Sequence, residues 1–226
     1  MDGYGKEGNA IWPMCRKEGE MVDPINVVVD TSHWNRDIDF AKLANAGIIG
    51  VIQKVTQGQT GVDFTYNANK QEALAAGLLW GAYHFGDGSD GVAQAEHFLS
   101  KVDDPSKTLL VLDFEFNRTG PTMSLEEARA FVTHVRNATG RFPGFYSGHY
   151  IKQQLGSNKD SVLAQCWFWL AQYGPTPVVP PNWETWTMWQ YTDGNYGRPP
   201  HDVAGVPFDR DKFNGPLQGL KRLWGV

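Results

Sequence analysis

Short apolar segments alternate with amphipathic stretches along most of this chain, and the alternation limits the possible folds more than any other feature. The apolar segments, which are typical of buried strands, cover residues 25–30, 48–55, 78–85, 108–116 and 142–147. Helical patterns lie between them, at residues 39–46, 64–76, 91–101 and 124–138. Ser124 and Glu127 stand at the spacing of a capping box at the start of the last helix. The connections suit parallel strands, so the pattern predicts repeated βα units.

The alternation of strand and helix patterns ends after Ser147. Residues 167–172 and 187–192 resemble strands, but a proline-rich stretch at 174–183 joins them where a long helix would be expected. A last short strand is expected next to Asp209, before that residue. Eight strands with about five helices predict an α/β fold, a modified TIM-like barrel written (β/α)5(β)3.

Composition excludes several classes of protein. With 226 residues, 41% hydrophobic and 20% charged, the chain suits one folded domain rather than a disordered protein. Twenty Lys and Arg against 25 Asp and Glu give a net charge of −5, which argues against a nucleic-acid partner. No apolar run reaches the roughly 18 residues of a membrane span. Cys15 and Cys166 are too few for a disulfide framework or, by themselves, a zinc site.

Residues 1–24 lack the periodicity of a packed element, so we expect a loose N-terminal extension. They also lack the basic start and apolar stretch of a secretory signal. The charged run 17–20 directly precedes Met21. This raises the hypothesis that Met21, rather than Met1, is the natural start.

Acidic residues gather at the expected C-terminal ends of strands, where βα barrels carry their chemistry. Asp30 closes the first strand, Asp113 and Glu115 end the fourth, and Asp209 lies at the last. Asp113 and Glu115 are two apart, so their side chains share one face with Cα atoms about 7 Å apart. Two carboxylates after an apolar run are costly to bury without a purpose. The structural alternatives are pairing with Lys or Arg at the barrel mouth and, for Asp30 or Asp209, capping of a loop.

Crowded carboxyl groups push their pKa values apart, so that one is ionised while another keeps its proton. Glycosidic cleavage uses such a pair, one group protonating the leaving oxygen and negative charge stabilising the cationic transition state. Acids alone would also suit a magnesium or calcium site. His84, at the end of the third strand, is either a polar rim residue or a ligand-binding one.

Aromatic residues are dense in the last third of the barrel. Seven fall within 25 residues: Trp167, Trp169, Tyr173, Trp183, Trp186, Trp189 and Tyr191. An electron-rich ring face suits the slightly positive C–H face of a sugar. We expect about half of these rings to belong to the core and the others to a sugar-binding groove.

A set of motifs in this order resembles a known family. The segments are VVVDTSHWNRDIDF, GVIQKVTQG, DFTYNANKQEALAAGLLWGAYHF, LLVLDFEF, GFYSGHY, FWLAQY, TMWQYT and FDRDKFNG. Together they resemble glycoside hydrolase family 25, the lysozymes (N-acetylmuramidases) of the Chalaropsis type. The resemblance covers residues 25–216 and implies a flattened barrel of eight strands and five helices.

The resemblance also implies an activity and a set of site residues. It implies hydrolysis of the β-1,4 bond between N-acetylmuramic acid and N-acetylglucosamine in peptidoglycan, with no metal or other cofactor. By position, Glu115 matches the general acid, Asp113 its partner, and Asp30 and Asp209 the flanking acids. The expected substrate-binding residues are Tyr83, His84, Tyr146, Trp169, Tyr173 and Gln190.

One position departs from the family pattern. Thr56-Gln57-Gly58 stands where the family usually has T-E-G. The absence of this carboxylate would change local hydrogen bonding or a contact in the groove, but it does not affect the acid pair.

These observations lead us to expect a bacteriolytic muramidase with an extension at 1–24, a catalytic barrel at 25–216 and a C-terminal tail at 217–226. We expect a monomer whose partner is the glycan strand of peptidoglycan. It would be made in a bacterial cytoplasm without a signal peptide, as a phage lysin or an exported enzyme, and act on the cell wall. The competing hypothesis is a non-catalytic glycan-binding barrel. For Asp113, assistance to the substrate's acetamido group, with retention, is preferred over direct nucleophilic attack.

Overall fold

The structure is a computed structural model that describes residues 23–226 of the chain. The sequence-based predictions about the N-terminal extension, the choice of start residue and Cys15 therefore lie outside the described residues. Within the described residues, no helix is both long and apolar enough to cross a bilayer.

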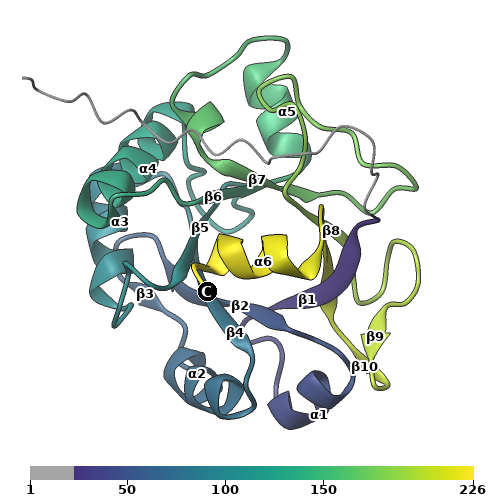
Figure 1. Cartoon of the computed structure of the whole chain (residues 1–226). Coiled ribbons are helices and arrows are strands. Elements are labelled where there is room, and N and C mark those ends of the chain that lie inside the picture. The colour runs from purple at the N-terminus through teal and green to yellow at the C-terminus, as the bar shows by residue number, and fades with distance from the viewer. Residues whose placement is uncertain (1–22) are drawn as a thin grey trace, which may run out of the picture.

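Eight strands form a closed barrel, as the sequence predicts (Figure 1). They are β1 Ile25–Thr31, β2 Gly50–Gln57, β4 Leu79–Phe85, β5 Leu109–Asp113, β6 Gly144–Ser147, β7 Trp167–Ala171, β8 Met188–Asp193 and β11 Asp209–Phe213. β1 pairs with both β2 and β11, which closes the barrel. The first seven run parallel, and β11 lies antiparallel between β8 and β1. Three short strands lie in connections: β3 Gly61–Val62, β9 Asp202–Val203 and β10 Val206–Pro207.

Each of the first five barrel strands is followed by a helix, which confirms the (β/α)5(β)3 arrangement. The helices are α1 Phe40–Asn45, α2 Tyr66–Ala75, α3 Gly91–Ser100, α4 Leu125–Thr139 and α5 His149–Leu155. α5 has no counterpart among the residue ranges that we predicted. A single 3-10 turn, Leu163–Gln165, precedes β7. The described chain has no helix from β7 to β11, where the sequence pattern also breaks.

The predicted capping box at the start of α4 is present. The Glu127 backbone N–H donates to Ser124 Oγ at 3.2 Å, and the Ser124 N–H donates to Glu127 Oε2 at 2.6 Å. α3 packs closely on this turn, since a Cβ on Gly91 would lie 2.1 Å from the Glu127 carbonyl oxygen. The glycine therefore allows α3 and α4 to approach each other.

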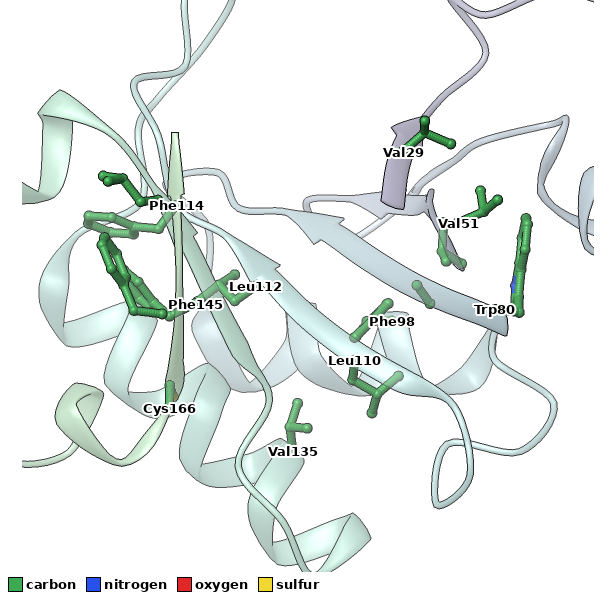
Figure 2. Close-up of a cluster of buried hydrophobic side chains, with 14 of the residues drawn as sticks. Val29, Val51, Trp80, Phe98, Leu110, Leu112, Phe114, Val135, Phe145 and Cys166 are labelled. Atoms are coloured by element: carbon green, nitrogen blue, oxygen red, sulfur yellow. The ribbon is translucent and has the colours of Figure 1, made fainter. Parts of the chain in front are cut away.

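Alternation along the strands divides the buried apolar side chains into two sets. One set faces outward and packs against the helices; Figure 2 shows Leu110 and Leu112 of β5 in this layer, together with Phe98 of α3 and Val135 of α4. The other set fills the barrel and includes Leu109 and Val111 of β5. A strand inside a helix-covered barrel thus buries both faces, which accounts for its continuous apolar run.

The expectation of a C-terminal tail at 217–226 is wrong, because these residues form helix α6, Leu217–Trp224. In Figure 1 this yellow helix lies across the middle of the barrel. Leu220 and Trp224 are buried in the interior cluster, and a Cβ on Gly50 would lie 3.2 Å from the Trp224 ring. Since Gly50 begins β2, α6 closes the end of the barrel at which the parallel strands start.

The last strand also differs from the expected one. We expected it to precede Asp209, whereas β11 begins at this residue and runs antiparallel. An antiparallel strand places its first residue beside the last residues of its parallel neighbours, and Asp209 is paired in register with Asp30. The acid therefore reaches the expected end of the barrel from the opposite chain direction.

We predict that Trp224→Ala lowers the free energy of unfolding by about 3–5 kcal/mol, the usual cost of removing a large buried aromatic side chain. Urea unfolding followed by far-UV circular dichroism measures the change. Leu217→Ala on the same helix is the control, because Leu217 is 41% exposed and its loss should change stability by about 0.5 kcal/mol or less. A loss below about 1 kcal/mol for Trp224→Ala would show that α6 is not needed to close the barrel.

Candidate active site

A pocket of about 310 Å³ opens at the C-terminal ends of the parallel strands. All four predicted acids line it, and so do five of the six predicted substrate-binding residues. The lining residues are Asp30, Ser32, Trp34, Lys54, Tyr83, Phe85, Asp113, Glu115, Tyr146, Trp169, Tyr173, Gln190, Asp193 and Asp209. The structure therefore brings together groups that come from segments spread over most of the chain.

Strand β5 delivers the acid pair. Its inward-facing residues are Leu109, Val111 and Asp113, so the barrel interior changes from apolar to acidic towards the C-terminal end of the strand. The chain beyond the strand is held by the Phe114 N–H, which donates to the Tyr146 carbonyl at 2.9 Å, and Phe114 is buried on the outward face. Glu115 consequently points into the pocket beside Asp113, as the two-residue spacing predicts.

The assignment of His84 to substrate binding is wrong. His84 is fully buried, its ring nitrogens lie 2.8 Å from Thr56 Oγ1 and 3.0 Å from Gln94 Oε1, and it stacks on Phe131. Burial lowers its pKa to about 4. Successive residues of a strand face opposite sides, so with Tyr83 inside the barrel, His84 must face the helices.

Gln190 holds one wall of the pocket together. Its Oε1 accepts hydrogen bonds from the hydroxyl groups of Tyr146 and Tyr173, each at 2.9 Å. Its Nε2 donates to Asp30 Oδ2 at 2.7 Å. One amide therefore orients two phenols and a carboxyl from three other parts of the chain. Of the seven clustered aromatic residues, only Trp169 and Tyr173 line the pocket, and the other five pack elsewhere, so the core holds more than the expected half.

Sequence reasoning missed Asp211, which is fully buried behind the pocket. Its Oδ1 accepts a hydrogen bond from Trp169 Nε1 at 2.7 Å, while its buried Oδ2 has no hydrogen-bond partner among the described residues. Burial raises the pKa of both Asp30 and Asp211 well above the usual range of aspartate, and Asp211 raises that of Asp30 further. The signal was available, because Asp209 and Asp211 have the same two-residue spacing as Asp113 and Glu115.

Lys54 was also missed, and it is the one cation lining this pocket in the described structure. Its Nζ donates to Gln57 Oε1 at 2.8 Å and lies 4.8 Å from the centre of the Phe85 ring. Gln57, the departure from the family pattern, is therefore a hydrogen-bond partner of the lysine that faces the acids.

Burial and charge act in opposite directions on the acid pair. Burial raises the pKa of Asp113 well above its usual range and the neighbouring Glu115 raises it further, while Lys54 lowers it. Burial likewise raises the pKa of Glu115, and Lys54 lowers it. A groove whose carboxyl groups stay protonated at a higher pH than solvent-exposed carboxyl groups do can carry out acid catalysis near neutral pH.

The acids lie on two walls. In the circular order of the eight strands, β11 stands four places from β5 in either direction, so Asp209 faces the acid pair across the pocket. Asp30 is beside Asp209 on the neighbouring strand. Burial, together with Asp30 and Asp193, raises the pKa of Asp209 to about 8. Asp209 is thus largely protonated at neutral pH and can donate a hydrogen bond.

Comparisons with known proteins agree with this geometry. The model of glycosyl hydrolases family 25 matches residues 29–198. Lysozyme M1 of Streptomyces globisporus is 34% identical over 210 residues, which cover 86% of this chain and 70% of that protein. The solved bacterial lysozyme from Streptomyces coelicolor has a TM-score of 0.76 and 31% identity, covering 89% of this chain and 97% of its own. The family GH25 lysozyme from Aspergillus fumigatus has a TM-score of 0.75 and 32% identity, covering 89% and 99%.

We predict that Asp209→Asn stabilises the protein at alkaline pH. The folded pKa of about 8 lies above the ordinary 3.8, so the stability contributed by the neutral acid is complete below about pH 4 and is lost as pH rises towards 8. Asparagine stays neutral, so the variant's advantage in melting temperature should grow over this window, by about 2–4 °C for each kcal/mol.

Calorimetry at about pH 4 and about pH 8 measures the advantage. The exposed Asp37→Asn is the control, and its difference from the parent should be similar at both pH values. An Asp209→Asn variant that loses its advantage as pH rises would contradict the raised pKa.

Proposed function

Because the chain belongs to glycosyl hydrolases family 25 and is a glycoside hydrolase of the lysozyme type, we propose that it cleaves the β-1,4 bond between N-acetylmuramic acid and N-acetylglucosamine in peptidoglycan. The observation that carries the proposal is the acid pair: Asp113 ends β5, Glu115 follows two residues later, and both enter a pocket whose lining holds three further acids, Asp30, Asp193 and Asp209. Such a pocket suits a bond whose cleavage needs a proton and a stabilised positive charge.

Glu115 is the proposed general acid. It is the more accessible member of the pair, since Asp113 is only 6% exposed, and a leaving oxygen must come within hydrogen-bond distance of the acid. Its raised pKa keeps the proton available at a pH at which a solvent-exposed glutamate would have lost it.

Asp113 is the proposed partner that orients and stabilises the 2-acetamido group of the sugar, which then attacks the anomeric carbon with overall retention. Two carboxyl groups two residues apart on one strand reach the same side of the sugar. A direct nucleophile has to approach opposite the leaving oxygen, which is awkward beside the acid. The positive charge of Lys54 favours the ionised form of Asp113 that this role requires.

The remaining lining residues have binding roles in this proposal. Asp30 and Asp209 hold sugar hydroxyl groups from the opposite wall, and Tyr83, Tyr146, Trp169, Tyr173 and Gln190 shape the sugar site. We propose that residues 25–216 are the catalytic unit, with α6 as its closure, and that the barrel acts on bacterial walls as a monomer.

We predict that Glu115→Gln lowers the rate of wall lysis by about 10²–10⁴-fold, because glutamine cannot supply the proton. The decrease in turbidity of purified cell walls measures the rate, and thermal unfolding checks the fold. Glu96→Gln, on the exposed surface of α3, is the matched control and should lyse walls like the parent. Activity of Glu115→Gln within about tenfold of the parent would assign the acid to another residue. If the parent binds walls without lysing them, the non-catalytic glycan-binding barrel stands instead.

We further predict that a soluble glycan whose muramic acid lacks the N-acetyl group is cleaved slower by about two orders of magnitude or more, while it still binds. The reason is that substrate assistance needs the acetamido oxygen as nucleophile. Reducing-end release on matched acetylated and deacetylated glycans gives the ratio. Cleavage at a comparable rate, or an adduct on Asp113 trapped with a fluorosugar, would establish direct attack.

A further inference from the structure

A second pocket of about 290 Å³ adjoins the active-site pocket and plays no part in the function proposed above. It is lined by His33, Lys54, Gln57, Thr60, Gly61, Val62, Asp63 and Asp87. Lys54 lines both pockets, so the two pockets are neighbours that share this side chain. The second pocket lies over the connections that follow β1, β2 and β4.

Two large aromatic side chains stand in solvent beside these two pockets. Trp34 is 81% exposed and Phe64 is 77% exposed. The His33 ring lies between them, with its centre 4.7 Å from that of Trp34 and 5.8 Å from that of Phe64. We name Trp34, His33 and Phe64 the aromatic ledge. Exposed rings gathered at one site, next to a groove, are typical of a binding surface.

The ledge is held in place before any ligand binds. The buried Asp63 carboxylate accepts hydrogen bonds from the His33 N–H at 2.8 Å and from the Thr65 N–H at 3.0 Å. It also contacts the His33 ring Nδ1 at 3.0 Å and accepts from the Thr65 hydroxyl at 2.6 Å. One carboxylate thus ties the loop that carries Trp34 to the segment that carries Phe64. Such preorganisation reduces the entropy lost on binding.

We propose that the aromatic ledge and the second pocket bind a further pyranose ring of the same glycan strand, beyond the sugars at the scissile bond. The inference rests on the proposed function and names the length of glycan that the enzyme recognises. An aromatic face stacks on the C–H face of a sugar, and a glycan strand that passes Lys54 reaches both pockets, because this side chain lines each of them.

The charges of the second pocket favour a neutral sugar over a peptide stem. Asp63 and Asp87 are acidic, and the amine of Lys54 is already bonded to Gln57. Free carboxylates, whether of a peptide or of the lactyl group of N-acetylmuramic acid, would therefore be repelled. The hydroxyl and acetamido groups of N-acetylglucosamine would not, so the ring bound here is N-acetylglucosamine. Gln57 uses its amide oxygen on Lys54, which leaves its NH₂ group to donate to such a ligand.

The test uses peptide-free glycan strands of alternating N-acetylglucosamine and N-acetylmuramic acid, in a short and a long defined length. The readout is the ratio of kcat/KM on the long strand to that on the short strand. Phe64→Ala should lower this ratio about 3- to 10-fold, the size of one aromatic stacking contact, through KM rather than kcat. Leu74→Ala, which removes a half-exposed side chain near the end of α2, is the control and should keep the parent ratio.

An unchanged ratio in Phe64→Ala would overturn the proposal. A ratio that falls only on strands carrying peptide stems would overturn it too, and would assign the ledge to the peptide. A second measurement separates this inference from the proposed function: binding of the same strands to Glu115→Gln, followed by tryptophan fluorescence. If the parent cuts no glycan but the preference for long strands in binding depends on Phe64, the proposed function fails and the ledge stands.

Discussion

A closed barrel has one interior, and the two-residue alternation of each strand decides which side chains enter it. The same rule that fills the lower layers with Leu109, Val111 and Ile52 brings Asp113 into the mouth. Helix α6 seals the other end with Leu220 and Trp224, so the charged layer lies above a fully apolar one. This stacking explains why burial is the largest cause of the raised pKa of Asp30, Asp113, Glu115, Asp209 and Asp211.

Burying so many carboxyl groups in one mouth would be unfavourable without compensation. The structure supplies it locally: Gln190 donates to Asp30, Trp169 donates to Asp211, and Lys54 offers its charge to the acid pair. These partners differ in charge, since Gln190 and Trp169 are neutral and Lys54 is a cation, so they affect the pKa values of the acids differently. Only the pair on β5 has the cation nearby, which separates a wall suited to chemistry from an opposite wall suited to holding hydroxyl groups.

The sequence allowed most of the barrel and its acids to be predicted, because short apolar strands and D-x-E spacing are local patterns. His84 was wrongly assigned to the pocket because histidine was considered for its chemistry alone. Side chains alternate along a strand, so once Tyr83 points into the barrel, His84 must point outward. Helix α6 was missed because it is short, and its apolar face, formed by Leu220, Leu223 and Trp224, packs against a barrel that has to exist first. The place of Lys54 beside the acids depends on contacts between distant strands, which no local pattern records, whereas Asp211 was missed although its spacing to Asp209 is a local pattern.

The seal at the base of the barrel has a further consequence for engineering. Val226 is exposed and follows directly on α6, so a polypeptide joined to it would leave the molecule on the side away from the pocket. A fused wall-anchoring module would then hold the barrel by its base and leave the mouth free to face the glycan. The linker, rather than the barrel, would set how far along a strand one anchored molecule can work.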